Sequence, residues 1–254
     1  MTIKSINPAT GELAARDEET SPTAVQSIIA AVHDAFINWR GISFAERARP
    51  MRRAAEILRT NAGDFARLMA REMGKPVREG VAEAQKCALG CDFYAENAGR
   101  LLARELVKTE ARNSFVTFNP LGVVLAVIPW NFPFWQVFRF AAPSLMAGNA
   151  AVLTHASNVP ECALAIEDIF RRAGFPDNLF RTLMIGSEQV EAVIEHPRVR
   201  AVTLTGSGAA GKAVARKAGE MLKKRCSSWV AATHIWSFRT PIWNWPPRYA
   251  PRVG

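Results

Sequence analysis

The sequence predicts an α/β fold, with a parallel sheet flanked by helices and a helical region before it. Apolar residues recur at helical spacing through roughly the first 110 positions. Beyond that point, short apolar runs alternate with helical segments, and the connections between them are short. Such alternation is typical of a parallel sheet covered by helices on both faces.

The N-terminal region is expected to contain three helices. Apolar residues from Pro22 to Trp39 recur at intervals of three and four, which predicts an amphipathic helix with one buried face. Because proline does not fit a helix interior, a second helix is expected to start at Pro50 and to reach about Arg59. Small residues between Val77 and Ala98 predict a third helix that packs closely.

Strands and helices alternate after Arg112. Helices are expected over 160–173, after an N-cap at Ser187, and from the glycine-rich turn at 206 to about residue 224. The predicted strands are 114–119, 121–128, 150–153, 180–185 and 199–205.

Composition excludes several classes of protein. With 254 residues, 49% apolar and 22% charged, the chain is long enough for a sizeable core and is not disordered. No apolar run is long enough to span a membrane, and the N-terminus lacks a secretory signal. Cys87, Cys91, Cys162 and Cys226 form neither a disulfide framework nor a metal-binding pattern, so we expect no metal and a cytoplasmic location.

The positive charge does not indicate nucleic-acid binding. Residues 1–224 carry 28 basic and 23 acidic side chains, mostly interleaved, while residues 225–254 carry four arginines and no acid. Neither part has a dense run of Lys and Arg, so we expect no nucleic-acid partner.

Two strand ends carry candidate chemistry. Asn131 lies between Pro129 and Pro133, whose restricted backbone would hold the amide as a rigid donor for an oxyanion; an ordinary turn asparagine is the alternative. Gly206 to Gly211 spell G-x-G-x-x-G between a strand and a helix, where backbone N–H groups can bind phosphate. No acidic residue ends a later strand about 20 residues on, so this is not the standard dinucleotide fingerprint.

A third strand end, Thr154 to Asn158, says little alone, and His155 is expected to be a surface or capping residue. It gains meaning from further segments spaced along the chain. These are Asn7-Pro8-Ala9-Thr10-Gly11-Glu12, Asn119-Pro120-Leu121-Gly122-Val123, Ile128-Pro129-Trp130-Asn131-Phe132-Pro133, Leu145-Met146-Ala147-Gly148-Asn149-Ala150 and Leu204-Thr205-Gly206-Ser207. In this order and spacing, residues 1–224 resemble the N-terminal half of the NAD(P)-dependent aldehyde dehydrogenase superfamily, and the stretch from His155 to Pro160 is most similar to bacterial succinate-semialdehyde dehydrogenases.

The resemblance implies a Rossmann-like sheet and a role for each matching position. Asn131 would supply the oxyanion-hole amide, and Ile128, Pro129 and Trp130 would line the nicotinamide side of the cofactor cleft. Gly206 and Ser207 would contact the pyrophosphate.

Two positions on the next strand bear on the choice between NAD and NADP. Thr154 stands where the family usually has a lysine at the adenosine ribose, a loss worth about 1–3 kcal/mol of cofactor binding if that bond was charge-assisted. Ser157 stands where NAD-preferring members often carry glutamate, which would leave room for the 2′-phosphate of NADP.

The resemblance also implies chemistry that is absent here. Family members use a cysteine thiolate to attack the aldehyde and a glutamate to activate water. The glutamate belongs to a Leu-Glu-Leu-Gly-Gly strand and the cysteine to a Gly-Gln-x-Cys segment, and neither string occurs in this sequence. We therefore expect this chain to be inactive, and we assign none of its cysteines a catalytic role.

Residues 225–254 have an unusual composition, with four of the chain's seven Trp and no Asp, Glu or Lys. With suitable synonymous codons and one added nucleotide, residues 225–234 read Ala-Val-Leu-Glu-Leu-Gly-Gly-Ser-Asp-Pro in the shifted frame. Residues 240–246 read Asp-Ala-Asp-Leu-Glu-Leu-Ala in the same frame. We therefore expect a frameshifted tail, no strand after residue 224 and an incomplete sheet; a native tail that binds a membrane or a partner is the alternative.

The sequence thus divides into a truncated cofactor-binding domain, 1–224, and the tail, 225–254. Residues 114–128 include a strand that resembles the family's oligomerisation segment, so the intact family implies a homo-oligomer. The first hypothesis is a fragment of an enzyme that oxidises an aldehyde, such as succinate semialdehyde, with NAD or NADP. A non-catalytic nucleotide-binding or interaction protein that uses the Trp-rich tail is the second.

Overall fold

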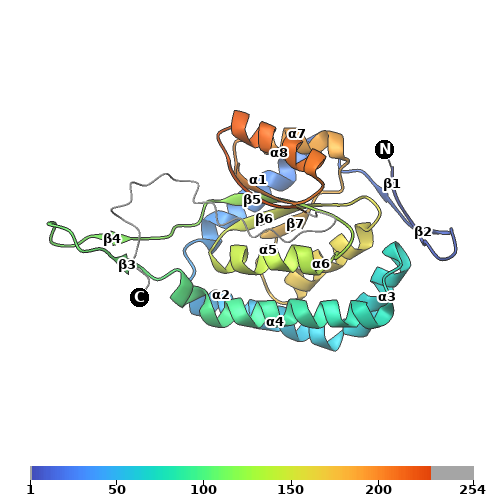
Figure 1. Ribbon diagram of the computed structural model, residues 1–254, viewed down its shortest axis with the longest axis horizontal. Coiled ribbons are helices and arrows are strands. Elements are labelled where there is room, and N and C mark those ends of the chain that lie inside the picture. Colours follow the sequence, from blue (N-terminus) through green and yellow to red (C-terminus); the bar gives the residue numbers. More distant parts are fainter. Residues whose placement is uncertain (1, 230–254) are drawn as a thin grey trace.

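The computed structural model describes residues 2–229, and it confirms the predicted α/β class (Figure 1). Its centre is a five-stranded sheet in the order β7-β6-β5-β8-β9, with every neighbouring pair parallel. The strands are β5 (Val123–Ile128), β6 (Ala150–His155), β7 (Phe180–Thr182), β8 (Val199–Gly206) and β9 (Lys224–Trp229).

Helices cover both faces of the sheet, as right-handed crossovers between parallel strands require (Figure 1). On one face lie α1 (Pro22–Trp39), α7 (Val190–Glu195) and α8 (Gly208–Glu220); on the other lie α5 (Trp135–Met146) and α6 (Pro160–Arg172). Below α5 and α6, a further layer consists of α2 (Phe44–Thr60), α3 (Ala62–Met73) and α4 (Val77–Leu101).

The core lies between these layers, and its pattern follows from the sequence. β5 and β6 are apolar and almost completely buried, as strands covered on both faces must be. On α1, the residues buried against the sheet recur at intervals of three and four: Val25, Ile29, Val32, Phe36 and Trp39. Ser21 caps this helix by accepting a hydrogen bond from the Ala24 N–H at 3.2 Å.

The N-terminal region differs from the prediction in three ways. A hairpin of β1 (Thr2–Ile6) and β2 (Leu13–Glu18) precedes the helices, and α3 was not predicted. In addition, α2 begins at Phe44 and contains Pro50. Ser43 and Glu46 form a reciprocal capping box at that start, and Pro50 is buried, so these contributions offset the hydrogen bond that the proline cannot donate.

Four later expectations also need correction. The strand expected at 114–119 is only β4 (Phe115–Val116), paired with β3 (Glu105–Leu106) in an exposed two-stranded arm. Ser187 begins the 3-10 turn η1 (Ser187–Gln189), so it does not cap α7 through its side chain. The last helix ends at Glu220, and residues 224–229 form a strand.

β9 contradicts the expectation that nothing follows β8 in the sheet. Its backbone pairs with β8 from Lys224 to Trp229, and backbone hydrogen bonds do not require an apolar pattern. Its first three side chains are exposed, in contrast to the buried residues of β8. The remainder of the predicted tail, 230–254, with the second shifted-frame match at 240–246, lies outside the described residues.

Candidate functional site

The three strand ends singled out in the sequence meet at one edge of the sheet. Ile128 of β5 is in register with His155 of β6, and Val127 of β5 with Leu204 of β8. The chain leaves β5 toward β6 on one side, whereas β8 lies on the other side, so the strand order reverses between β5 and β8. In open α/β sheets, ligands bind at the carboxyl ends of the strands beside this reversal.

The loop after β5 presents Asn131 at this edge. Ile128 is buried at the strand end, whereas Trp130 is 49% exposed. Asn131 is partly buried, and its Oδ1 has no hydrogen-bond partner among the described residues. The unpaired Oδ1 can only accept a hydrogen bond, so the group that could donate to an oxyanion is the side-chain NH₂ of the same amide.

Buried side chains from other elements contact the residues that follow Asn131. Glu83 of α4 accepts hydrogen bonds from the N–H groups of Phe134 and Trp135, each at 2.9 Å, through Oε1. Its Oε2 forms an ion pair with Lys75, which is also buried. These contacts fix the first turn of α5 to α4.

The end of β6 forms the second part of the site, next to the end of β5. His155 is buried, and burial lowers the pKa of its imidazole to about 4. Its Nε2 lies 3.0 Å from the Pro133 carbonyl oxygen, so it is neither the surface nor the capping residue expected from the sequence but a buried contact to the loop after β5. Thr154 is buried and its Oγ1 has no partner among the described residues, whereas Ser157 is exposed.

The end of β8 forms the third part of the site, on the other side of β5. Ser207 is the N-cap of α8, and its Oγ accepts a hydrogen bond from the Ala210 N–H at 3.3 Å. The other N–H groups in the first turn of this 13-residue helix have no acceptor within the helix. They lie next to Gly206 on an exposed turn, which suits a bound phosphate.

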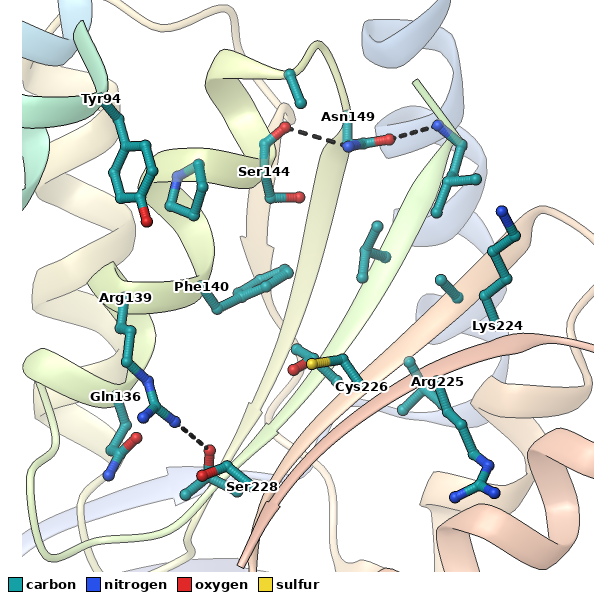
Figure 2. Close-up of a pocket in the computed structure, with 18 of the residues that line it drawn as sticks. Tyr94, Gln136, Arg139, Phe140, Ser144, Asn149, Lys224, Arg225, Cys226 and Ser228 are labelled. Carbon is teal, nitrogen blue, oxygen red and sulfur yellow. Dashed lines mark hydrogen bonds between the residues drawn. The ribbon is translucent and has the colours of Figure 1, made fainter. Parts of the chain in front are cut away.

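A separate cavity of about 690 Å³ lies between α4, α5 and the face of β5, β8 and β9 (Figure 2). Arg139 of α5 lines it, and its guanidinium donates a hydrogen bond to the Thr205 Oγ1 at 3.1 Å. Arg139 was not among the predicted site residues. The signal was one cation within the otherwise uncharged helix Trp135–Met146.

Three of the four cysteines in residues 2–229 are enclosed, whereas Cys226 on β9 is exposed and lines the cavity. Cys87, Cys91 and Cys162 are fully buried, and burial raises the pKa of each thiol. Within residues 2–229, no three His, Cys, Asp or Glu side chains are grouped so as to hold a metal ion. No helix in that range combines the length and apolar character needed to cross a membrane.

The sequence matches the aldehyde dehydrogenase family over residues 1–228. The chain belongs to that family. It is 49% identical over 224 residues to a probable succinate-semialdehyde dehydrogenase [NADP(+)] of Synechocystis, a match that covers 88% of this chain and 49% of that protein. Over 226 residues it is 49% identical to succinate-semialdehyde dehydrogenase [NADP(+)] 1 of Mycobacterium tuberculosis, covering 88% of this chain and 50% of that protein.

Solved structures give the same family fold. The succinic semialdehyde dehydrogenase of Streptococcus pyogenes, solved in complex with NADP+, aligns with a TM-score of 0.87 at 32% identity. The alignment covers 89% of this chain and 50% of that one. This member of the family therefore spans about half the length of the relatives it matches.

Proposed function

We propose that residues 1–224 are the cofactor-binding part of an NAD(P)-dependent aldehyde dehydrogenase whose substrate is succinate semialdehyde. The observation that carries the proposal is the convergence of the Asn131 loop and the α8 N-terminus on one sheet edge. The names of the Synechocystis and Mycobacterium tuberculosis relatives, both succinate-semialdehyde dehydrogenases, support the substrate.

In this proposal each site residue has one task. The amide of Asn131 donates to the substrate oxygen as negative charge develops there, and it needs no reorganisation because its loop is already held. Ile128, Pro129 and Trp130 line the nicotinamide side. Bound NAD or NADP would supply the acceptor for the hydride that leaves the aldehyde carbon.

The described residues fit either cofactor and favour tolerance of NADP. Gly206, Ser207 and the first turn of α8 offer backbone N–H groups to the pyrophosphate. Ser157 is exposed and carries no charge, so a 2′-phosphate near it meets no carboxylate there. Thr154 is buried, and we propose that its short side chain leaves the ribose without the cation that the family usually provides.

The cavity beside Arg139 fits the same proposal. Its lining is mostly apolar, and the guanidinium of Arg139 reaches it from α5 (Figure 2). A cation in such surroundings favours a carboxylate, and succinate semialdehyde carries one at the end opposite the aldehyde. We assign Arg139 to that recognition.

We also propose that this chain does not turn over by itself. The three buried thiols cannot present a thiolate, and Cys226 belongs to the segment 225–254 that we interpret as frameshifted. The exposed Arg225 and Cys226 of β9 support that interpretation, because the shifted frame would place Ala and Val at these two positions of the sheet.

The exposed arm of β3 and β4 supports an oligomeric role for 114–128. Leu106 and Phe115 project large apolar side chains from two short strands, and Leu106 is 86% exposed. A surface of this kind is typical of a contact with another chain. We therefore propose that the intact protein is a homo-oligomer.

The deciding experiment restores the reading frame. The DNA around the Lys224 codon is sequenced, one nucleotide is inserted there, and the restored gene and the present gene are expressed in parallel. We expect oxidation of succinate semialdehyde with NADP+ from the restored protein and none from the present chain.

Each alternative gives a different result. If no frame downstream encodes Leu-Glu-Leu-Gly-Gly, the frameshift is refuted. Turnover by the present chain would refute its inactivity. If no such frame exists and calorimetry shows tight NADP+ binding by the present chain, the chain is a non-catalytic nucleotide-binding protein.

A further inference from the structure

The loop that carries Asn131 is held by side chains from two distant elements. It connects β5 to α5 and contains Pro129 and Pro133, neither of which has an N–H to donate. Other groups must therefore attach the loop to the rest of the molecule. Two buried side chains form hydrogen bonds to it, Glu83 from α4 and His155 from β6.

Glu83 fixes the C-terminal end of the loop. Its Oε1 accepts two backbone hydrogen bonds at 2.9 Å, from residues three and four positions after Asn131. A carboxylate at this position also satisfies N–H groups that α5 cannot pair internally. The hydrogen bonds are charge-assisted, which makes them stronger than bonds between neutral groups.

Lys75 completes this contact. It forms an ion pair with the Oε2 of Glu83, and its Nζ lies 3.9 Å from the ring centroid of Phe132. One buried cation therefore contacts both the carboxylate that holds the loop and the residue next to Asn131. The pair is fully enclosed, with both side chains less than 5% exposed.

His155 fixes the middle of the loop. Its Nε2 lies 3.0 Å from the Pro133 carbonyl oxygen, which can only accept, so a hydrogen bond there requires the proton on Nε2. The Nδ1 of the neutral ring then accepts from the Ala156 N–H at 2.9 Å, a group that also donates to the Ile128 carbonyl at 3.0 Å. The hydrogen bond to Pro133 links the end of β6 to the loop after β5, and it requires one tautomer of His155.

We propose that Glu83 and His155 are positioning residues, which hold Pro133, Phe134 and Trp135 so that the Asn131 amide is fixed at the sheet edge. The contacts occupy three consecutive residues, and the amide itself keeps an unpaired Oδ1. The value of this arrangement for catalysis rests on the proposed function, in which Asn131 binds the developing oxyanion. The contacts themselves do not depend on that function.

The test follows the side-chain NH₂ signal of Asn131 by NMR in the ¹⁵N-labelled chain, identified by its loss in Asn131→Ala. His155→Leu removes the hydrogen bond to the Pro133 carbonyl, and Glu83→Ala removes the acceptor of the Phe134 and Trp135 N–H groups. His155→Gln keeps a donor and Glu83→Gln keeps an acceptor, so these conservative variants are expected to rescue the signal. No cofactor or substrate is needed, so a failure of the proposed function would not affect this measurement.

Glu72 provides the matched control. It is also a buried carboxylate, and it accepts hydrogen bonds from the N–H groups of Glu161 and Cys162 at the start of α6. Glu72→Ala therefore removes the same kind of helix cap from α6, without removing a hydrogen bond to the loop that carries Asn131.

We expect the Asn131 signal to move or broaden in His155→Leu and Glu83→Ala, and to keep its wild-type position in Glu72→Ala, His155→Gln and Glu83→Gln. An unchanged signal in both disruptive variants would overturn the proposal, as would an equal change in Glu72→Ala. If the disruptive variants do not fold, the wild-type chain still decides. At pH 7, ¹⁵N spectra must show His155 neutral and protonated on Nε2, and any other state overturns the proposal.

Discussion

Replacing Glu83 with alanine should cost this protein a large part of its stability. The change leaves the ammonium of Lys75 buried without its partner, because Lys75 is only 6% exposed. It also removes the acceptor of two backbone N–H groups at the start of α5. All three consequences lie in one enclosed site, so they are coupled and their costs do not simply add.

The magnitude follows from the burial. Removing one partner of a buried ion pair costs about 3–5 kcal/mol, and bonds to a charged group contribute roughly 1.5–3 kcal/mol each. Because these overlap, we expect Glu83→Ala to lower the free energy of unfolding by about 3–5 kcal/mol. With a urea dependence of about 3 kcal/mol per M, the midpoint should fall by roughly 1–1.7 M.

The assay is urea unfolding followed by far-UV circular dichroism. Glu83→Gln, which keeps an acceptor, should lose less than Glu83→Ala. The double variant Lys75→Met/Glu83→Ala should be more stable than the sum of the two single losses implies, because it removes the unpaired charge. A loss below about 1 kcal/mol in Glu83→Ala would refute the reasoning, because breaking a buried ion pair costs about 3–5 kcal/mol.

Three further predictions concern pH, cofactor choice and association. The pKa of His155 is about 4 when folded and 6.5 ordinarily, so its contribution to stability is fully present above pH 6.5. This contribution, roughly 3 kcal/mol, is lost as the pH falls from 6.5 to 4. The urea midpoint of His155→Gln should therefore depend less on pH than that of the wild-type chain. If Ser157 lies near the 2′-phosphate, Ser157→Glu should weaken NADP+ binding relative to NAD+ by about tenfold or more in calorimetry; equal affinities would contradict that placement. Leu106→Lys should reduce self-association in sedimentation velocity, and an unchanged distribution would show that the β3–β4 arm is not the contact.

Much of the architecture could be predicted because it depends on neighbours in the chain. The helix from Pro22 to Trp39 combines apolar periodicity with the N-cap Ser21 directly before it, so both signals are local in the chain. The order of strands and helices after residue 120 followed in the same way. The misplaced start of α2 shows the limit, because a capping box and burial outweighed the rule against Pro50.

The site was only partly predictable. Asn131 and Ser207 stood out because strand ends are where ligands bind in such sheets, and the structure places both at one edge. Glu83 lies 51 residues before Phe134 in the chain, and nothing in its own neighbourhood indicates that contact. Arg139 is the one charged residue of α5, but its local sequence does not show that its guanidinium reaches Thr205 of β8.

The sequence by itself determined the family, the order of elements and the residues at the strand ends, because these depend on local pattern and spacing. The tertiary structure alone decided which groups hold the Asn131 loop, which tautomer His155 adopts, and that residues 224–229 pair with β8. The physical reason is that burial and hydrogen-bond partners come from segments far apart in the chain, and only folding brings those segments together.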